Sequence, residues 1–180
     1  MASKADSGRP APWRIIGWAV PAGLLFVPWL SQWPWSAADF IVAAVIFAIV
    51  GVTFELAVRA SGNTYYRLGS ATAIATAFLL VWINLTVGIV GNENNPLNLT
   101  FFVVIGAALV GGIAARFAAE GMARAMTVAA VLQGLIGAAV FLFDGGRTGP
   151  PDRASLFLLI EFFAVAWLVS AWLFRRAAQQ

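Results

Sequence analysis

The sequence contains no cysteine and no histidine, and only 11% of its 180 residues are charged. The missing thiols and imidazoles exclude disulfides, iron–sulfur clusters, histidine-ligated haem and the usual zinc sites, so we expect no metal and no cofactor. Soluble domains carry about 25% charged residues, which their aqueous surface requires. A chain so poor in charge and 61% hydrophobic therefore has lipid as its natural solvent.

Six apolar stretches each approach the roughly 20 residues that an α-helix needs to cross a bilayer. They cover residues 13–30, 38–58, 68–90, 99–118, 123–143 and 154–174. The connections between them are short, which favours antiparallel neighbours. The sequence therefore predicts an all-α integral membrane bundle of six transmembrane helices. It forms a single domain over residues 13–176, between a disordered cytoplasmic tail at 1–12 and a short tail at 177–180.

The basic residues test this helix count, because the cytoplasmic loops of membrane proteins are rich in lysine and arginine. With the N-terminus inside, nine of the eleven basic residues fall on the inner side, and Arg147 and Arg153 fall outside. The inner residues are Lys4, Arg9, Arg14, Arg59, Arg67, Arg116, Arg124, Arg175 and Arg176. This pattern predicts that both termini are cytoplasmic. It also explains the net charge of +3 without a nucleic-acid surface.

Short polar signals mark several of the predicted helix ends. Ser36 and Asp39 have the spacing of a capping box before the second helix. Asn98 is expected to cap the fourth helix, and the segment 144–146, Asp-Gly-Gly, is expected to end the fifth.

Small residues recur at intervals of four on three predicted helices, where they let helix backbones approach closely in lipid. The rows are Gly69, Ala73 and Ala77; Ala107, Gly111 and Ala115; and Gly134 with Ala138. We expect the third, fourth and fifth helices to form the close-packed centre. An oligomer interface or a substrate groove is the alternative use of the same rows.

Glu161 is the ionisable residue that stands out most within the predicted spans. It follows Arg153 by eight residues, about 12 Å of helix, and its neighbours are leucine, isoleucine and phenylalanine. A charged carboxylate at that depth costs several kcal/mol, so such groups are paired, protonated or functional. We predict that Glu161 binds a proton or a cation. The alternative is a protonated glutamate that joins two helices.

Three further polar residues inside predicted helices are candidates for an ion or proton site. Gln133 lies at a depth similar to that of Glu161 and is expected to meet it, as a hydrogen-bond donor or as a link between helices. Glu55 stands four residues before Arg59, which favours an intrahelical ion pair or the cytoplasmic mouth of an ion path. Asn84 requires a partner inside the bundle.

The segment 91–98 between the third and fourth helices is dense in side-chain oxygens. Glu93 and Asn95 are its candidate ligands for a cation or a polar molecule. The segment lacks the spacing of a calcium-binding loop, so a turn capped by its own side chains is the competing interpretation.

One part of the chain carries a resemblance to a known group of proteins. It runs from residue 65 to residue 96 and comprises the segments 65–69 (YYRLG) and 77–84 (AFLLVWIN), followed by Gly91 and the loop 93–96. This part resembles small polytopic inner-membrane proteins of bacteria that carry no assigned function. The resemblance implies a multi-pass protein of the bacterial inner (plasma) membrane, and it implies no activity or site.

These observations leave two main hypotheses of function. The first is a small membrane transporter or ion-conducting protein, acting as an oligomer, that uses Glu161 as its intramembrane carboxylate. The second is a non-catalytic membrane subunit that scaffolds or stabilises a larger membrane complex. It is favoured by the minimal loops and by four aromatic residues, Phe157, Phe162, Phe163 and Trp167.

An enzyme is not expected, because without histidine or cysteine the acid–base repertoire shrinks to carboxylates, arginines and the tyrosines Tyr65 and Tyr66. The expected partners are the lipid bilayer and either further copies of the chain or partner membrane subunits, and not nucleic acid.

Overall fold

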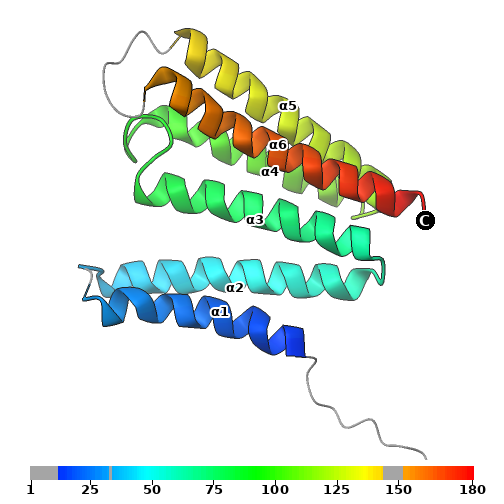
Figure 1. Ribbon diagram of the computed structural model, residues 1–180, viewed down its shortest axis with the longest axis horizontal. Coiled ribbons are helices and arrows are strands. Elements are labelled where there is room, and N and C mark those ends of the chain that lie inside the picture. Colours follow the sequence, from blue (N-terminus) through cyan, green and yellow to red (C-terminus); the bar gives the residue numbers. More distant parts are fainter. Residues whose placement is uncertain (1–11, 33, 144–151) are drawn as a thin grey trace, which may run out of the picture. The chain divides into compact units, whose positions relative to one another are not determined.

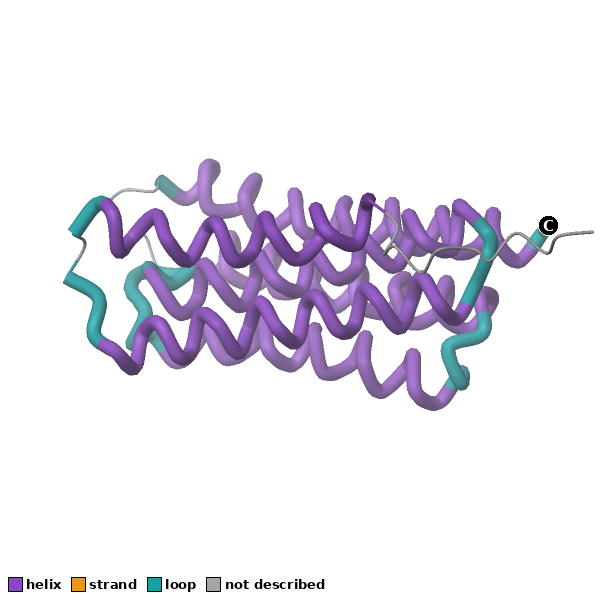
Figure 2. The backbone as a smooth tube through the Cα atoms, turned by 90° about the horizontal axis from the view of Figure 1, so that it is seen from below, coloured by secondary structure: helices purple, strands orange, loops and turns teal. Residues whose placement is uncertain are grey.

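The computed structural model describes residues 12–32, 34–143 and 152–180. These residues form six α-helices and one 3₁₀ helix, with no strand among them (Figure 1). The helices are α1 (Pro12–Leu30), α2 (Ala37–Ala60), α3 (Thr64–Thr86), η1 (Pro96–Asn98), α4 (Leu99–Ala114), α5 (Ala119–Phe143) and α6 (Arg153–Ala178). Figure 2 shows loops as short connections between long helices. The predicted all-α fold is confirmed for the described residues.

Among the described residues, five helical segments are long and apolar enough to cross a membrane: α2, α3, α4 with η1, α5 and α6. In length and composition they define a helical multi-pass membrane protein. The helix α1 runs through Pro21 and Pro28 and is not among the five. Residues 1–11 of the predicted tail and residues 144–151, with Arg147 and the predicted end signal of the fifth helix, lie outside the described residues.

The chain divides into two compact units, Met1–Thr53 and Phe54–Gln180, and the boundary falls within α2. In the first unit, Trp18 of α1 packs over Gly51 of α2, where a methyl group would lie 2.8 Å from the indole ring. The predicted capping box before α2 is confirmed. The Ser36 N–H donates to Asp39 Oδ2 at 2.7 Å, and the Asp39 N–H donates to Ser36 Oγ at 3.3 Å.

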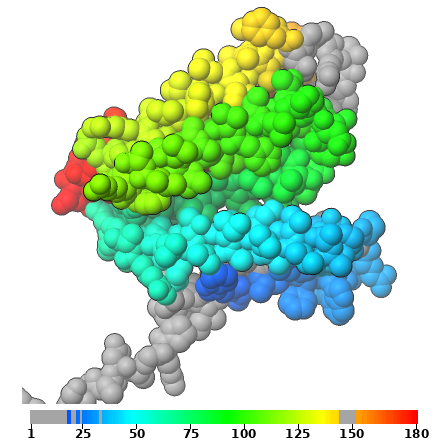
Figure 3. Space-filling view, turned by 180° about the vertical axis from the view of Figure 1, so that it is seen from behind, coloured from blue at the N-terminus to red at the C-terminus, as the bar shows by residue number. Residues whose placement is uncertain are grey.

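In the second unit, α3, α4, α5 and α6 pack as four neighbouring helices. The last of them, α6, contacts both α3 and α5, while α4 contacts α5 and, less extensively, α3. Figure 3 shows α4 and α5, coloured green to yellow, against each other across one face of this unit. The expectation that the third, fourth and fifth helices form the centre is wrong. Rows of small residues do not reveal the bulky side chains of α6. This helix supplies three of the largest fully buried side chains, Trp167, Phe163 and Phe174.

The predicted rows of small residues do lie at helix contacts. A methyl group on Gly111 of α4 would lie 2.7 Å from the Cβ of Ala125 in α5. In α3, Gly69 faces Phe174 of α6, and its carbonyl oxygen accepts a hydrogen bond of 2.8 Å from the Ser170 hydroxyl. Such close approach supplies the van der Waals contact that holds helices together in lipid.

The turn between α4 and α5 differs from the prediction, which extended the fourth helix to residue 118 and began the fifth at 123. The helix ends at 114 because Arg116 and Phe117 adopt left-handed backbone angles, with φ of 49° and 56°. The Phe117 N–H donates to the Gly112 carbonyl at 2.9 Å, which caps α4. From α3, the Tyr66 hydroxyl donates to the Phe117 carbonyl at 2.9 Å and holds the turn in place.

The loop between α3 and α4 is built around Asn98. The sequence predicts a third helix to residue 90, but it ends at 86, and Gly88 takes a left-handed φ of 74°. Contrary to the prediction, the Asn98 side chain does not cap α4. Its buried Oδ1 accepts from the N–H groups of Ile89 at 3.1 Å and Val90 at 2.8 Å. Its Nδ2 donates to the Asn92 carbonyl at 2.7 Å.

The start of α6 is fixed by Asp152, whose Oδ1 accepts from the Ser155 N–H at 3.0 Å. Hydrogen bonds from the Ser155 hydroxyl and then from its backbone N–H hold the pKa of the Asp152 carboxyl below its ordinary value. A carboxylate that stays charged here also faces the positive end of the helix dipole. This cap sets where α6 begins, and therefore where Glu161 lies along it.

Candidate functional site around Glu161

Glu161 lies in the first half of α6 and turns its carboxylate toward α5. A methyl group at Gly134 would lie 3.5 Å from Glu161 Oε2, and a methyl group at Gly137 would overlap Glu161 Oε1. We refer to this contact of Glu161 with Gly134 and Gly137 as the glycine notch. Gly134 belongs to a row of small residues that the sequence predicts, whereas Gly137 was not predicted, although a spacing of three residues puts both on one face of a helix.

The carboxylate of Glu161 is half-buried and has no hydrogen bond or ion pair with a described residue. The charged side chains of α5, Glu120 and Arg124, pair with each other near the start of that helix. Gly134 follows Arg124 by ten residues, or about 15 Å of helix. A charged carboxylate so far from a counter-charge costs several kcal/mol in an apolar helix, so the neutral form is favoured.

Gln133 lies beside the glycine notch and is fully buried. Its Nε2 donates over 3.5 Å to the carbonyl oxygen of Ile160, the residue before Glu161. The helices α5 and α6 therefore meet at the depth that was predicted for Gln133 and Glu161. The Gln133 amide, however, does not donate to the Glu161 carboxylate. The Oε1 atom of Gln133 has no hydrogen-bond partner among the described residues. A buried acceptor left without a donor costs about 1–3 kcal/mol, which makes this oxygen a ready acceptor.

Trp167 carries a second buried polar atom in this part of the structure, which was not predicted from the sequence. Its Nε1 has no acceptor among the described residues. It follows Ile160 by seven residues, so about 10 Å separates the two along one face of α6.

Phe163 and Trp167 are buried, whereas Phe162 is 59% exposed, so the aromatic residues that favoured a scaffold do not form one exposed surface.

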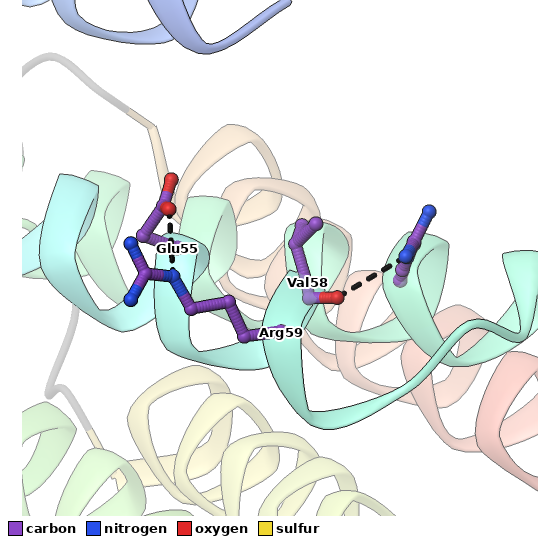
Figure 4. Close-up of polar contacts among 4 residues, drawn as sticks. Glu55, Val58 and Arg59 are labelled. Atoms are coloured by element: carbon purple, nitrogen blue, oxygen red, sulfur yellow. Dashed lines mark hydrogen bonds and ion pairs between the residues drawn. The ribbon is translucent and has the colours of Figure 1, made fainter. Parts of the chain in front are cut away.

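Asn84 and Glu55 make hydrogen bonds within their own helices. The Nδ2 of Asn84 donates to the Leu80 carbonyl at 2.7 Å, and its buried Oδ1 has no partner among the described residues. Glu55 forms the predicted ion pair with Arg59, with 2.9 Å between Oε1 and Nε (Figure 4). Of these three candidates, the structure places Gln133 at the α5–α6 interface, next to the residues that contact Glu161, and it places neither Asn84 nor Glu55 there.

Glu93 and Asn95, the candidate ligands of the α3–α4 loop, are used by the loop itself. Glu93 Oε1 accepts from the Asn94 side chain at 3.2 Å, and Asn95 Oδ1 accepts from the Leu97 N–H at 3.0 Å, which caps η1. The described residues contain no group of three or more His, Cys, Asp or Glu side chains that could hold a metal ion. The geometry is that of a turn capped by its own side chains.

The fold and the site together define the class, a helical multi-pass membrane protein with an unpaired carboxylate at a helix contact. Comparisons of the chain with protein-family models, with curated proteins and with solved structures gave no match.

Proposed function

We propose that this protein is a small membrane transporter or ion-conducting protein in which Glu161 binds the transported ion. The proposal is carried by one observation: a half-buried carboxylate without a counter-charge, set against two glycines within an apolar helix pair. Ionisable groups inside membrane spans are costly, and in membrane proteins they mark ion pathways and proton relays. An ordinary packing position would be filled more cheaply by an apolar side chain.

We propose six transmembrane helices, with α1 as the additional span, and both termini on the cytoplasmic side of a bacterial inner membrane. The distribution of the basic residues supports this orientation. Because the chain has no cysteine, Arg124→Cys and Arg153→Cys can each be labelled in intact spheroplasts with a membrane-impermeant maleimide. Labelling is expected at position 153 and not at 124. The reverse pattern would contradict the proposed orientation.

We further propose that the protein acts as a homo-oligomer or together with partner membrane subunits. The Glu161 carboxylate is only half-buried within one chain, so a second apolar surface would complete its enclosure. Its exposed neighbours Leu158 and Phe162 offer such a surface an apolar face on α6.

The role of Glu161 is tested by ion flux into liposomes that contain the purified full chain. Glu161→Gln keeps the size and polarity of the side chain but cannot ionise. We therefore expect pH-dependent flux to fall at least about tenfold, while the melting temperature in detergent stays close to that of the wild type.

The matched control is Glu120→Gln, which removes an exposed carboxylate that is paired with Arg124. It is expected to leave flux unchanged. Flux that survives Glu161→Gln would refute the role of Glu161. A wild-type protein that carries no ion, but purifies with a stoichiometric membrane partner, would instead favour the non-catalytic subunit that scaffolds a larger complex.

A further inference from the structure

The surroundings of Glu161 restrict which ion it can bind. We infer, on the basis of the proposed function, that this ion is the proton, and that the protonated carboxyl group of Glu161 donates its O–H to the unpartnered Oε1 of Gln133.

With the carboxylate in its observed position, no room is left for a metal ion between Glu161 and α5. Glu161 Oε1 fills the space that a methyl group at Gly137 would need, and Oε2 lies 3.5 Å from the methyl position of Gly134. The carboxylate therefore touches the helix backbone, and a sodium or potassium ion would have to separate them. A proton needs no such space. The nearby groove of about 280 Å³ is lined mainly by apolar side chains, among them Ile136 and Phe143, and Glu161 does not line it.

The oxygen ligands around Glu161 are too few for a metal ion. Calcium takes about six to eight oxygens, and potassium channels surround their ion with rings of carbonyl oxygens. Here the candidates are the two carboxylate oxygens and Gln133 Oε1, because the backbone carbonyls within α5 and α6 serve the helices themselves. The Ile160 carbonyl also accepts from Gln133. Such a set can hold a proton but cannot replace the hydration shell of a metal ion.

A protonated carboxyl group supplies what Gln133 lacks. An ionised carboxylate only accepts hydrogen bonds, whereas its protonated form has one O–H donor. When a hydronium ion gives its proton to one oxygen of Glu161, its own O–H bond breaks and leaves a water molecule, a new O–H bond forms on the carboxyl group, and the negative charge is neutralised. The buried Oε1 of Gln133, which has no donor among the described residues, can accept this O–H. Gln133 of α5 contacts Ile160 of α6, and the next residue of α5, Gly134, contacts the next residue of α6, Glu161. The side chains of Gln133 and Glu161 therefore start from neighbouring points on the two helices.

No charged side chain of α3, α5 or α6, whose residues the structure describes throughout, lies near this proton. The charged and titratable side chains of α3 and α5, the two helices that pack against α6, are in the first two turns of those helices, and those of α6 other than Glu161 are at its ends. They are Tyr65, Tyr66 and Arg67; Glu120 and Arg124; and Arg153, Arg175 and Arg176. The Tyr66 ring contacts Phe174, about 20 Å along α6 from Glu161. Proton binding at Glu161 is therefore set by its burial and by Gln133.

The identity of the ion is tested in liposomes that contain the full chain. A pH-sensitive dye reports proton entry, and radioactive sodium reports metal-ion entry, each under an imposed membrane potential. We expect proton entry in sodium-free buffer and no sodium entry. Sodium entry that Glu161→Gln abolishes would overturn the proton but keep the proposed function. Flux that does not depend on Glu161, or an absence of flux, would overturn the proposed function itself.

The role of Gln133 is tested by Gln133→Leu, which removes the acceptor. The protonated form loses one hydrogen bond, so half-maximal proton flux is expected at about tenfold higher proton concentration. The control Thr127→Val removes an α5 hydroxyl that donates to the Ala123 carbonyl, and it should leave this concentration unchanged. An unchanged concentration in Gln133→Leu overturns the inference about Gln133. Should that variant not fold, Gln133→Asn shortens the side chain, and the same shift is expected.

Discussion

Replacing Gly137 with alanine is expected to abolish most of the ion flux while leaving the fold intact. The added methyl group would overlap Glu161 Oε1 and lie 3.0 Å from Ile160 Cγ2. The carboxylate is at the end of a flexible side chain and can move aside, and overpacking of this kind costs about 1–3 kcal/mol. Displacement of a reacting group by about 1 Å can reduce a rate about 100-fold. We therefore expect flux to fall about 10- to 100-fold, and the melting temperature in detergent to fall by less than about 10 °C.

Two other glycines provide graded controls for this prediction. A methyl group at Gly134 would meet Glu161 Oε2 at 3.5 Å, an ordinary van der Waals distance, so Gly134→Ala should reduce flux less than Gly137→Ala. Gly106 of α4 has open space where a methyl group would lie. Gly106→Ala should keep full flux and stabilise its helix by about 0.5–1 kcal/mol. Equal flux in the Gly137 and Gly106 variants would show that the glycine notch does not position the carboxylate.

Asn98→Ala is expected to destabilise the second unit by about 2–5 kcal/mol. The Asn98 side chain is 3% exposed and is the acceptor for the N–H groups of Ile89 and Val90. Both of those residues are buried, so alanine would leave two donors without partners, at about 1–3 kcal/mol each. The change in the free energy of unfolding is measured by denaturing the protein in mild detergent while circular dichroism monitors its helix content.

Asn94→Ala is the matched control in the same loop. Asn94 is exposed and its side chain donates to Glu93, so its loss should change stability by less than about 0.5 kcal/mol. Asn98→Asp keeps the acceptor for Ile89 and Val90 but cannot donate to the Asn92 carbonyl. Its stability is expected to lie between those of the wild type and Asn98→Ala. If Asn98→Ala were as stable as Asn94→Ala, the loop would not depend on Asn98.

The helices are predictable from the sequence because each apolar run is bounded by polar or turn-forming residues. The capping box of Ser36 and Asp39 and the ion pair of Glu55 and Arg59 are predictable for a related reason. Both are local patterns, in which residues three or four positions apart meet in any helix that contains them.

Two helix ends could not be predicted, because hydropathy does not report backbone angles. The apolar run continues past the end of α3, yet Gly88 turns left-handed there. At the end of α4, Arg116 and Phe117 adopt the same conformation without a glycine to indicate it. Asn98 was misassigned because its partners Ile89 and Val90 lie eight or nine residues earlier, beyond the reach of a capping pattern.

The neighbourhood of Glu161 was predictable, but its contacts were not. Depth along the helices and a short connection indicate that Gln133 and Glu161 lie at one level, and α5 and α6 do pack together. Which atoms meet depends on how each helix is rotated about its axis. That rotation places Gly137 against the carboxylate and leaves Gln133 Oε1 and Trp167 Nε1 without partners among the described residues. A single sequence does not specify it.

The order of helices around the second unit also bears on how the protein is made. Most contacts of α3 within this unit are with α6, which leaves the ribosome after α3, α4 and α5. Until then, the Gly69 carbonyl lacks the Ser170 hydroxyl, and the Tyr66 ring lacks Phe174. The hairpin of α4 and α5 can form earlier, because its helices are consecutive in the chain. Synthesis of α6 therefore completes the unit in one late step, which joins the first of its four helices to the third.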